Sequence, residues 1–212
     1  MAMKKLIIKP SEDFKDNYKI LIGSILPRPI SVISTKNEDG TDNVAPFSFF
    51  TACSAKPMIV AFAPLIKSST GEEKDTLKNI KREKEFVLNF CTEEIADKIN
   101  LTSTELPYGK SEFEFAGLTP ESSELINACR IKESPINFEC KLRDILSYGD
   151  QPGCGSLVTG EVINVHISEE IFFDGKVDTD KFNPIGRGAG NDWIKCDSRI
   201  IKQRLMQAQI QK

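Results

Sequence analysis

The chain has 212 residues, of which 40% are hydrophobic, and this length predicts one domain over residues 1–212 with a single sizeable core. The formal net charge is −3, and Lys and Arg are interspersed with Asp and Glu, so the composition argues against a nucleic-acid partner. No run approaches the roughly 20 apolar residues of a membrane span, and residues 1–10 do not resemble a signal peptide, so we expect a cytoplasmic protein with no membrane partner.

Cysteine and histidine usage limits the possible chemistry. No Cys-x-x-Cys pair occurs, so we expect no metal site and interpret the cysteines as scattered buried thiols. His166 is the only histidine, which excludes a multi-histidine metal site within one chain, and its place among apolar residues argues against a histidine-based triad. The apolar neighbours of His166 indicate that it lies in a strand. The six cysteines are Cys53, Cys91, Cys129, Cys140, Cys154 and Cys196.

The first third of the chain predicts strands. Residues 30–35 are rich in β-branched side chains, and the turn formers at 37–40 indicate a hairpin with the extended run 43–54. Pro46 interrupts that run and should lie at an edge or a bulge. Residues 58–62 predict a short apolar strand.

Short helices and a long loop follow in the middle of the chain. A capping Asp75 and apolar residues three apart predict a helix over 75–80, and residues 85–90 read as a strand. A second helix is expected to open at Thr92. Residues 102–117 are polar and rich in turn formers, which predicts a long surface loop of the kind that often covers a site.

The last third predicts two long strands, at 136–146 and 157–167, joined by the breaker-rich connection 147–155. Several strands with only short helices between them favour a small barrel over a parallel βαβ sheet. Spaced apolar residues in the tail 198–210 are compatible with a terminal helix.

Glycine-rich phosphate-binding motifs are incomplete here, because the third glycine is missing after Gly153-Cys-Gly155 and after Gly186-Arg-Gly188. Residues 67–70 and 74–76 instead combine hydroxyl groups and lysines with the start of a helix, which would suit a terminal phosphate. A solvated loop followed by an ordinary helix cap explains these residues equally well.

The run Asn43–Thr51 alternates polar and aromatic side chains around a proline. Such a surface could hold a flat heteroaromatic ligand, with apolar faces against the ring and Asn43 or backbone groups at its polar edge. From the residues alone, an edge strand whose phenylalanines belong to the core is the favoured explanation.

Taken in order, several segments resemble the flavin reductase-like family of FMN-binding split barrels. No single motif is diagnostic, but their co-linear succession over about residues 15–195 is specific, and it leaves a C-terminal tail at 196–212. The segments are 26–35, 43–54, 74–80, 86–90, 100–103, 115–120, 133–140, 160–167 and 183–187.

This resemblance implies a mainly β fold, a six-stranded antiparallel Greek-key split barrel with short flanking helices. It also implies a homodimer that binds FMN, with FAD possible, near the subunit interface. For the flavin ring, the matching positions are Asn43, Ala45, Pro46, Phe47 and Ser48, with Thr51, Ala52 and Ser54 close by. For the phosphate they are Lys74 and Thr76, aided by Ser68 and Ser69.

Two positions have a less defined role in this resemblance. Arg28 matches the family's Pro-Arg-Pro turn, where a structural and a flavin-adjacent role are both open. Residues 186–193 depart from the usual pattern, in which two glycines precede an aromatic residue that is commonly Tyr. Trp193 could stack on a flavin or a substrate, or pack in a dimer.

The leading functional hypothesis is an NAD(P)H-dependent flavin reductase that passes electrons onward to a partner oxygenase or another redox protein. NAD(P)H would be a transient donor, and no catalytic side chain is required because the flavin carries the chemistry. The alternative is a flavoredoxin-like FMN electron carrier that a protein partner reduces. A third possibility is a barrel that has lost its ligand and serves as an interaction module.

Overall fold

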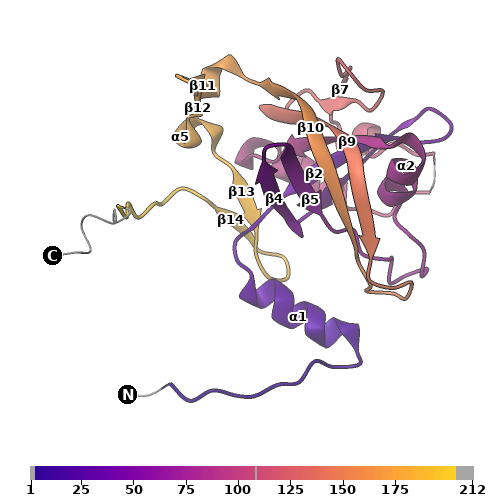
Figure 1. Ribbon diagram of the computed structural model, residues 1–212, viewed down its shortest axis with the longest axis vertical. Coiled ribbons are helices and arrows are strands. Elements are labelled where there is room, and N and C mark those ends of the chain that lie inside the picture. Colours follow the sequence, from indigo (N-terminus) through magenta and orange to yellow (C-terminus); the bar gives the residue numbers. More distant parts are fainter. Residues whose placement is uncertain (1–2, 108, 204–212) are drawn as a thin grey trace.

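The computed structural model describes residues 3–107 and 109–203, and its centre is an antiparallel sheet (Figure 1). Seven strands lie in the order β3-β2-β6-β9-β10-β5-β4. The mainly β class is confirmed, whereas the expected count of six strands differs by one. The strands are β2 (Ser31–Lys36), β3 (Asp42–Phe47), β4 (Phe50–Ala55), β5 (Met58–Phe62), β6 (Glu85–Phe90), β9 (Ile136–Ser147) and β10 (Ser156–Ile167).

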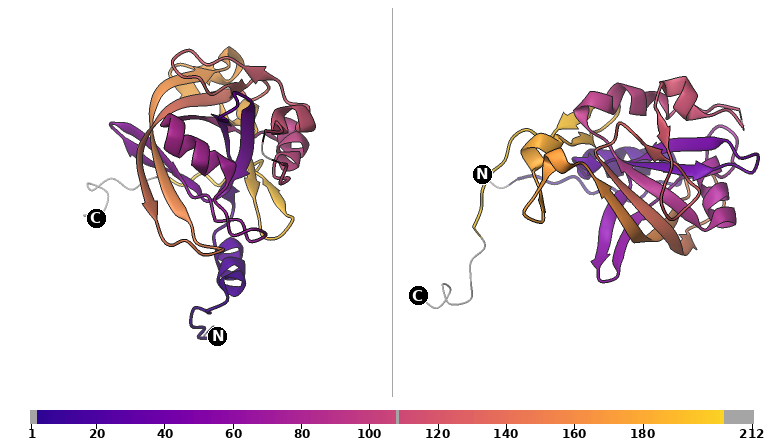
Figure 2. Two further views of the ribbon diagram at one scale, coloured as in Figure 1. Left: turned by 90° about the vertical axis from the view of Figure 1, so that its right-hand side faces the viewer. Right: turned by 90° about the horizontal axis from the view of Figure 1, so that it is seen from above.

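The two edge strands explain why the sheet curls. Only Ser48 and Phe49 separate β3 from β4, although these strands lie at opposite edges of the sheet. The three Cα steps from Phe47 to Phe50 span at most roughly 11 Å, so the two edges must meet there. The result is a barrel that is split between β3 and β4, and the curled sheet is visible in Figure 2.

Pro46 lies inside β3, opposite Val32, so the predicted interruption at this proline is wrong. The chain leaves the strand after Phe47 instead. The prediction that Pro46 lies at an edge is confirmed, and the hydrogen bonds give the reason. The Val44 N–H donates outward to Glu112 at 3.1 Å, and the residue two positions on faces the same way. Pro46 therefore removes no backbone hydrogen bond between β3 and β2.

The two long strands predicted at 136–146 and 157–167 are confirmed as the β9–β10 hairpin, which runs from Ser147 opposite Ser156 to Ile136 opposite Ile167. This hairpin joins the two halves of the sheet. His166 lies in β10, also as predicted, and its Nε2 is 2.5 Å from Oε1 of the buried Glu139. Gly160 of β10 is required by packing, because a Cβ atom there would lie 2.4 Å from the Phe86 ring.

Two apolar clusters pack on opposite faces of the sheet. Val32 belongs to one and Ile33 to the other, as expected for neighbours in a strand. The first cluster includes Ile99 and Phe113 from the helices that follow β6, and the second includes Ile80 from the helix that precedes β6. The side chain of Phe47 lies in this second cluster, 5.1 Å from the Phe62 ring between centroids.

The helices are short: α1 (Phe14–Ser24), α2 (Asp75–Glu83), η1 (Glu93–Ile95), α3 (Ala96–Leu101), α4 (Glu112–Ala116), η2 (Glu169–Ile171) and α5 (Thr179–Phe182). None within the described ranges is long and apolar enough to cross a membrane. The capping role expected of Asp75 is wrong, because Lys74 occupies the N-cap position. The carboxylate of Asp75 instead pairs with Lys67 and Lys78, each at 3.5 Å.

Residues 102–117 were expected to form a surface loop. This expectation is wrong in part, because the segment contains helix α4. Phe113 and Ala116 lie three residues apart, so one helical turn buries both. The start of this helix covers the outer edge of β3, because the Ser111 hydroxyl donates to the Asp42 carbonyl at 2.6 Å.

Three small sheets complete the structure. Strands β1 (Arg28–Pro29), β13 (Ile185–Arg187) and β14 (Trp193–Lys195) form one, β7 (Pro120–Glu121) and β8 (Arg130–Ile131) the second, and β11 (Phe172–Phe173) and β12 (Lys176–Val177) the third. Residues 198–203 are not helical, and the rest of the expected terminal helix lies outside the described residues. Cys53 and Cys196 are exposed and Cys154 is half-buried, so only three of the six cysteines are the buried thiols expected.

Candidate functional site

Three hollows meet around Pro46, at the split of the barrel. The first, of about 70 Å³, has Lys67, Lys74 and Thr76 on its wall. The second, of about 230 Å³, is lined by Tyr18, Arg187 and Trp193 among others. The third, of about 160 Å³, lies along Phe47–Phe49 and extends to Lys74. Pro46 lines all three, so the hollows adjoin one another, and we call the three together the depression around Pro46.

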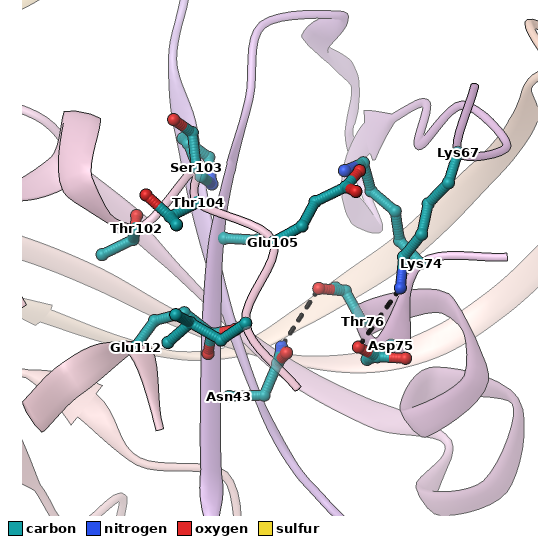
Figure 3. Close-up of a pocket in the computed structure, with 13 residues that line it drawn as sticks. Asn43, Lys67, Lys74, Asp75, Thr76, Thr102, Ser103, Thr104, Glu105 and Glu112 are labelled. Carbon is teal, nitrogen blue, oxygen red and sulfur yellow. Dashed lines mark hydrogen bonds and ion pairs between the residues drawn. The ribbon is translucent and has the colours of Figure 1, made fainter. Parts of the chain in front are cut away.

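The first hollow, which we call the lysine cavity, is built from several parts of the chain (Figure 3). The first turn of α2 supplies Lys74 and Thr76. The N–H of Leu77 donates to the Lys74 carbonyl at 2.9 Å, whereas the N–H groups of Asp75 and Thr76 have no partner within the helix. The loop after α3 supplies Thr102, Ser103 and Thr104. Cations, hydroxyls and a helix N-terminus are the groups that bind a phosphate.

Positive and negative charges both line the lysine cavity. Lys67 is neutralised by Asp75, whereas no carboxylate of the described residues lies within 4.0 Å of the Lys74 ammonium. Burial lowers the pKa of Lys74, and the charge of Glu105 opposes that shift. Burial also raises the pKa of Glu112, which favours its neutral form. Lys74 is therefore the cation of this cavity whose charge is least compensated.

Asn43 belongs to the lysine cavity and connects two of its walls. The side-chain amide donates to Thr35 Oγ1 at 3.0 Å and to Thr76 Oγ1 at 3.1 Å, so it ties β3 to the start of α2. The residues predicted to face the flavin ring are thus divided between different hollows. Asn43 and Ala45 line the lysine cavity, Phe47 and Ser48 line the other two hollows, and Pro46 stands between them.

The second hollow, which we call the aromatic cleft, lies between helix α1 and the turn from β13 to β14. The Arg187 guanidinium lies 5.3 Å from the Trp193 ring centroid, and Tyr18 lies 6.2 Å from Phe49 between ring centroids. Trp193 is half-buried and packs against the core. Aromatic rings at both sides of a cleft suit a planar ligand.

Arg28 holds the elements around the aromatic cleft together. The guanidinium is 3% exposed and donates to the carbonyls of Ile22, Ile25 and Gly188 at 2.7 to 3.1 Å. Its Nε donates to Ser48 Oγ at 3.2 Å. The side chain therefore fixes α1, the β13–β14 turn and Ser48 relative to one another, and it reaches the depression only through Ser48.

Besides Arg28, five predicted site residues do not line these hollows. Ser68 and Ser69 are exposed, and Ser69 touches the lysine cavity only through its hydrogen bond to Glu105 at 2.8 Å. Thr51, Ala52 and Ser54 are exposed on β4, in the β4–β5 hairpin that projects from the sheet (Figure 2). Their predicted place near a flavin at a subunit interface stays a prediction.

Sequence reasoning did not single out several residues that line the depression. The segments 100–103 and 183–187 had been noticed for their resemblance, but no role was assigned to them. Glu112 had been placed in a loop, and Tyr18 lies in a helix that was not predicted. The residues are Tyr18, Asn100, Thr102, Ser103, Thr104, Glu105, Glu112 and Arg187.

A split antiparallel barrel with a lysine-lined cavity beside an aromatic cleft defines a class of small-ligand-binding β-barrels. Within this class the chain belongs to the flavin reductase-like family. Residues 22–180 match the family described as "flavin reductase like domain".

Solved structures also resemble this chain in sequence and fold. Nitrilotriacetate monooxygenase component B from Bacillus cereus is 35% identical with a TM-score of 0.90, over 95% of this chain and all of that one. The 2-nitrobenzoate 2-nitroreductase of Pseudomonas fluorescens is 31% identical with a TM-score of 0.82, over 91% of this chain and 92% of that one. A flavoredoxin from Methanosarcina acetivorans shares the fold, with a TM-score of 0.76 at 18% identity over 98% and 100% of the two chains.

Proposed function

We propose that this protein is an NAD(P)H-dependent flavin reductase that holds FMN in the depression around Pro46. The observation that carries the proposal is that the lysine cavity and the aromatic cleft adjoin, since Pro46 and Ser103 line both. A phosphate on Lys74 and a ring beside Pro46 would then belong to one molecule.

The residues around Pro46 fit a phosphorylated heteroaromatic group. Lys74, Thr76 and the first turn of α2 offer the phosphate a cation, a hydroxyl and free N–H groups. Three carboxylates line the same cavity. Asp75 pairs with two lysines, burial raises the pKa of Glu112, and the charge of Glu105 acts on Lys74 from beyond 4.0 Å. Lys74 is therefore the lysine of the cavity that has no ion-pair partner among the described residues and can pair with an anion.

When bound, FMN supplies the hydride-accepting ring, so the protein needs no general base. The chain contributes binding and orientation. Lys74 anchors one end of the ligand, the backbone of Pro46–Ser48 borders the ring, and Arg28 holds Ser48 in place. Burial of the ring between this segment and Trp193 would exclude water from one face.

The relatives support a reductase that serves a second enzyme. The similarity to component B of a monooxygenase, at 35% identity over nearly the whole chain, suggests that reduced flavin or its electrons leave for a partner oxygenase. The flavoredoxin shares the fold alone at 18% identity, so the electron-carrier alternative gains no specific support. Stopped-flow reduction of the flavin distinguishes an electron carrier from a reductase.

The experiment is anaerobic stopped-flow mixing of the FMN-loaded protein with NADH and, separately, with NADPH. We expect bleaching of the flavin absorbance band with at least one donor. A protein that binds FMN but bleaches with neither donor would be the electron carrier. A colourless preparation that shows no change with FMN or FAD would be the unliganded interaction module.

We further propose a homodimer. Helix α1 stands away from the barrel (Figure 1), and its Ile20 and Leu21 side chains are each 46% exposed. The N-terminal segment beside it leaves Leu6 84% exposed and Ile7 91% exposed. An apolar surface of this kind is typical of an interface between subunits.

A further inference from the structure

We propose that Asn79 and Thr35 are positioning residues of the phosphate site, although neither lines the lysine cavity. Through Asn43 they orient the Thr76 hydroxyl so that it donates its hydrogen into the cavity. This inference rests on the proposed function, because it concerns how the same site is prepared for the phosphate of FMN.

A buried hydrogen-bonded network joins Asn79, Thr35, Asn43 and Thr76 and ends at the cavity. The Asn79 amide donates to Thr35 Oγ1 at 3.0 Å, and the Asn43 amide donates to the same oxygen at 3.0 Å. The second hydrogen of the Asn43 amide goes to Thr76 Oγ1 at 3.1 Å, a bond that Figure 3 shows as a dashed line. Each of the four residues is at most 4% exposed. The network is therefore shielded from water, and hydrogen bonds in such surroundings are stronger than at the surface.

Strand pairing and the helical repeat bring these side chains together. Thr35 of β2 lies directly opposite Asn43 of β3. Thr76 and Asn79 lie three residues apart in α2, so they face the same side of the helix. Asn79 is thus placed against the sheet, while Thr76 is placed at the wall of the cavity.

The direction of each bond decides what the Thr76 hydroxyl can do. An amide nitrogen carries two hydrogens and accepts none, so Asn43 only donates to Thr35 and Thr76. Thr35 Oγ1 accepts two amide hydrogens, which uses both of its lone pairs. Thr76 Oγ1 accepts from Asn43, and its own hydrogen has no acceptor among the described residues. That hydrogen is left for the cavity, where a doubly ionised phosphate offers only acceptors.

The network has a cost that a purely structural role does not explain. Asn79 donates its second amide hydrogen to Asn37 Oδ1 at 2.7 Å, but its own Oδ1 has no hydrogen-bond partner among the described residues. A buried acceptor without a partner destabilises the fold. The equally buried Asn89 of β6 has no such cost, because its Oδ1 accepts from the Ile131 N–H at 2.9 Å and from the Asn137 amide at 2.8 Å. An apolar side chain at position 79 would avoid the cost, so helix packing alone does not account for the amide there.

The experiment measures the preference for FMN over riboflavin, because only FMN has the phosphate. Quenching of flavin fluorescence gives the dissociation constants of both flavins in each protein, and their ratio is the preference. Thr76→Val keeps the shape of the side chain without the hydroxyl and should lower the preference about tenfold. Asn79→Ala should lower it about threefold, because the hydroxyl remains but is no longer held in one orientation. In the double variant, Asn79→Ala should add nothing to the effect of Thr76→Val.

Asn89→Ala is the matched control, because it removes a buried amide on the other face of the sheet. The Asn89 amide donates to Ser34 Oγ at 3.1 Å, and Ser34 is the neighbour of Thr35 in β2. This variant should lower the free energy of unfolding and keep the full preference. Thr35→Val breaks the same network without a change in α2, and it takes the place of Asn79→Ala if that variant does not fold. Since the preference is a ratio of two affinities in one protein, a general loss of folding cannot imitate its change.

An Asn79→Ala protein that keeps the full preference would overturn the positioning role. A loss of the same size with and without the Thr76 hydroxyl would also overturn it, as would equal affinity for FMN and riboflavin in the unmodified protein. Anaerobic bleaching is measured separately. An Asn79-dependent preference in a protein that neither donor bleaches would count against the reductase alone, and bleaching without such a preference would count against the positioning role alone.

Discussion

At the scale of single residues, the balance of charge in the lysine cavity decides how a phosphate is held. Lys67 and Lys74 both line this cavity, yet only Lys67 has a carboxylate partner in the described part of the chain. Glu112 is half-buried and accepts the Val44 N–H, so its charge state affects the same space. Two substitutions separate these contributions.

Lys74→Ala should weaken the binding of FMN by about tenfold or more, because one charge-assisted contact to the phosphate is lost. Riboflavin lacks the phosphate, so its affinity should change much less. Quenching of flavin fluorescence on titration with the protein measures the dissociation constants of FMN and of riboflavin. Lys78→Ala, four residues along α2 and paired outward with Glu72 and Asp75, is the matched control. Equal weakening of FMN and riboflavin would remove Lys74 from the phosphate site.

Glu112→Gln should strengthen FMN binding, and the gain should grow as the pH rises. Burial raises the pKa of Glu112, so the carboxyl is neutral at low pH and ionises as the pH passes its raised pKa. The ionised form adds a negative charge to the cavity that repels phosphate, whereas Gln stays neutral and can still accept the Val44 N–H. The FMN affinities of both proteins, measured across pH with riboflavin as reference, test this. A difference that stays constant with pH would contradict it.

At the scale of secondary-structure elements, one buried side chain connects segments that are far apart in the sequence. Arg28 bonds the last turns of α1, the β13–β14 turn and Ser48. These three elements surround the aromatic cleft, so the position of α1 and the shape of the cleft depend on each other.

Arg28→Ala should lower the free energy of unfolding by about 3 kcal/mol, because buried carbonyls lose a charged donor. Arg143→Ala removes an exposed pair with Glu161 and should cost no more than about 1 kcal/mol. Urea unfolding followed by circular dichroism compares the two variants. Hydrogen exchange should also show faster exchange in α1 of Arg28→Ala, and unchanged protection there would argue against the proposed link.

At the scale of the whole molecule, exposed apolar side chains on the N-terminal segment and α1 have no covering element in the described parts of the subunit. In Figure 1 these segments extend away from the barrel, where a second subunit could pack on them. Residues 51–55 of the projecting edge strand β4 are also exposed. A dimer would bury these surfaces and could bring Thr51, Ala52 and Ser54 of one subunit near the flavin of the other.

Sedimentation velocity should give twice the mass of one chain for the unmodified protein. Leu21→Glu should shift the distribution toward the monomer, because it places a charge on the apolar side of α1. Lys19→Glu changes an exposed residue of the same helix that pairs only with Asp16, and it should leave the dimer intact. A monomer at all concentrations in the unmodified protein would contradict the proposed assembly.

Local patterns in the sequence were sufficient for most strands of the large sheet, although β3 and β4 were expected as one run. The alternation of β9 and β10, the hairpin from β2 to β3 and the position of helix α2 all follow from residues near one another in the chain. Pro46 indicated an edge strand because a proline cannot donate to a central ladder. The order of the motifs also identified the family, since that information lies in the sequence itself.

Only the tertiary structure decided how those pieces share one site. Phe47 borders two hollows of the depression, but its ring packs in the core against Phe62. Helix α4 forms where a loop was expected, because its apolar pair is stabilised by packing on β3 and not by local propensity. Arg187 and Tyr18, 169 positions apart, reach one cleft through the contacts of Arg28. Local sequence sets which elements form, whereas long-range packing determines which side chains meet.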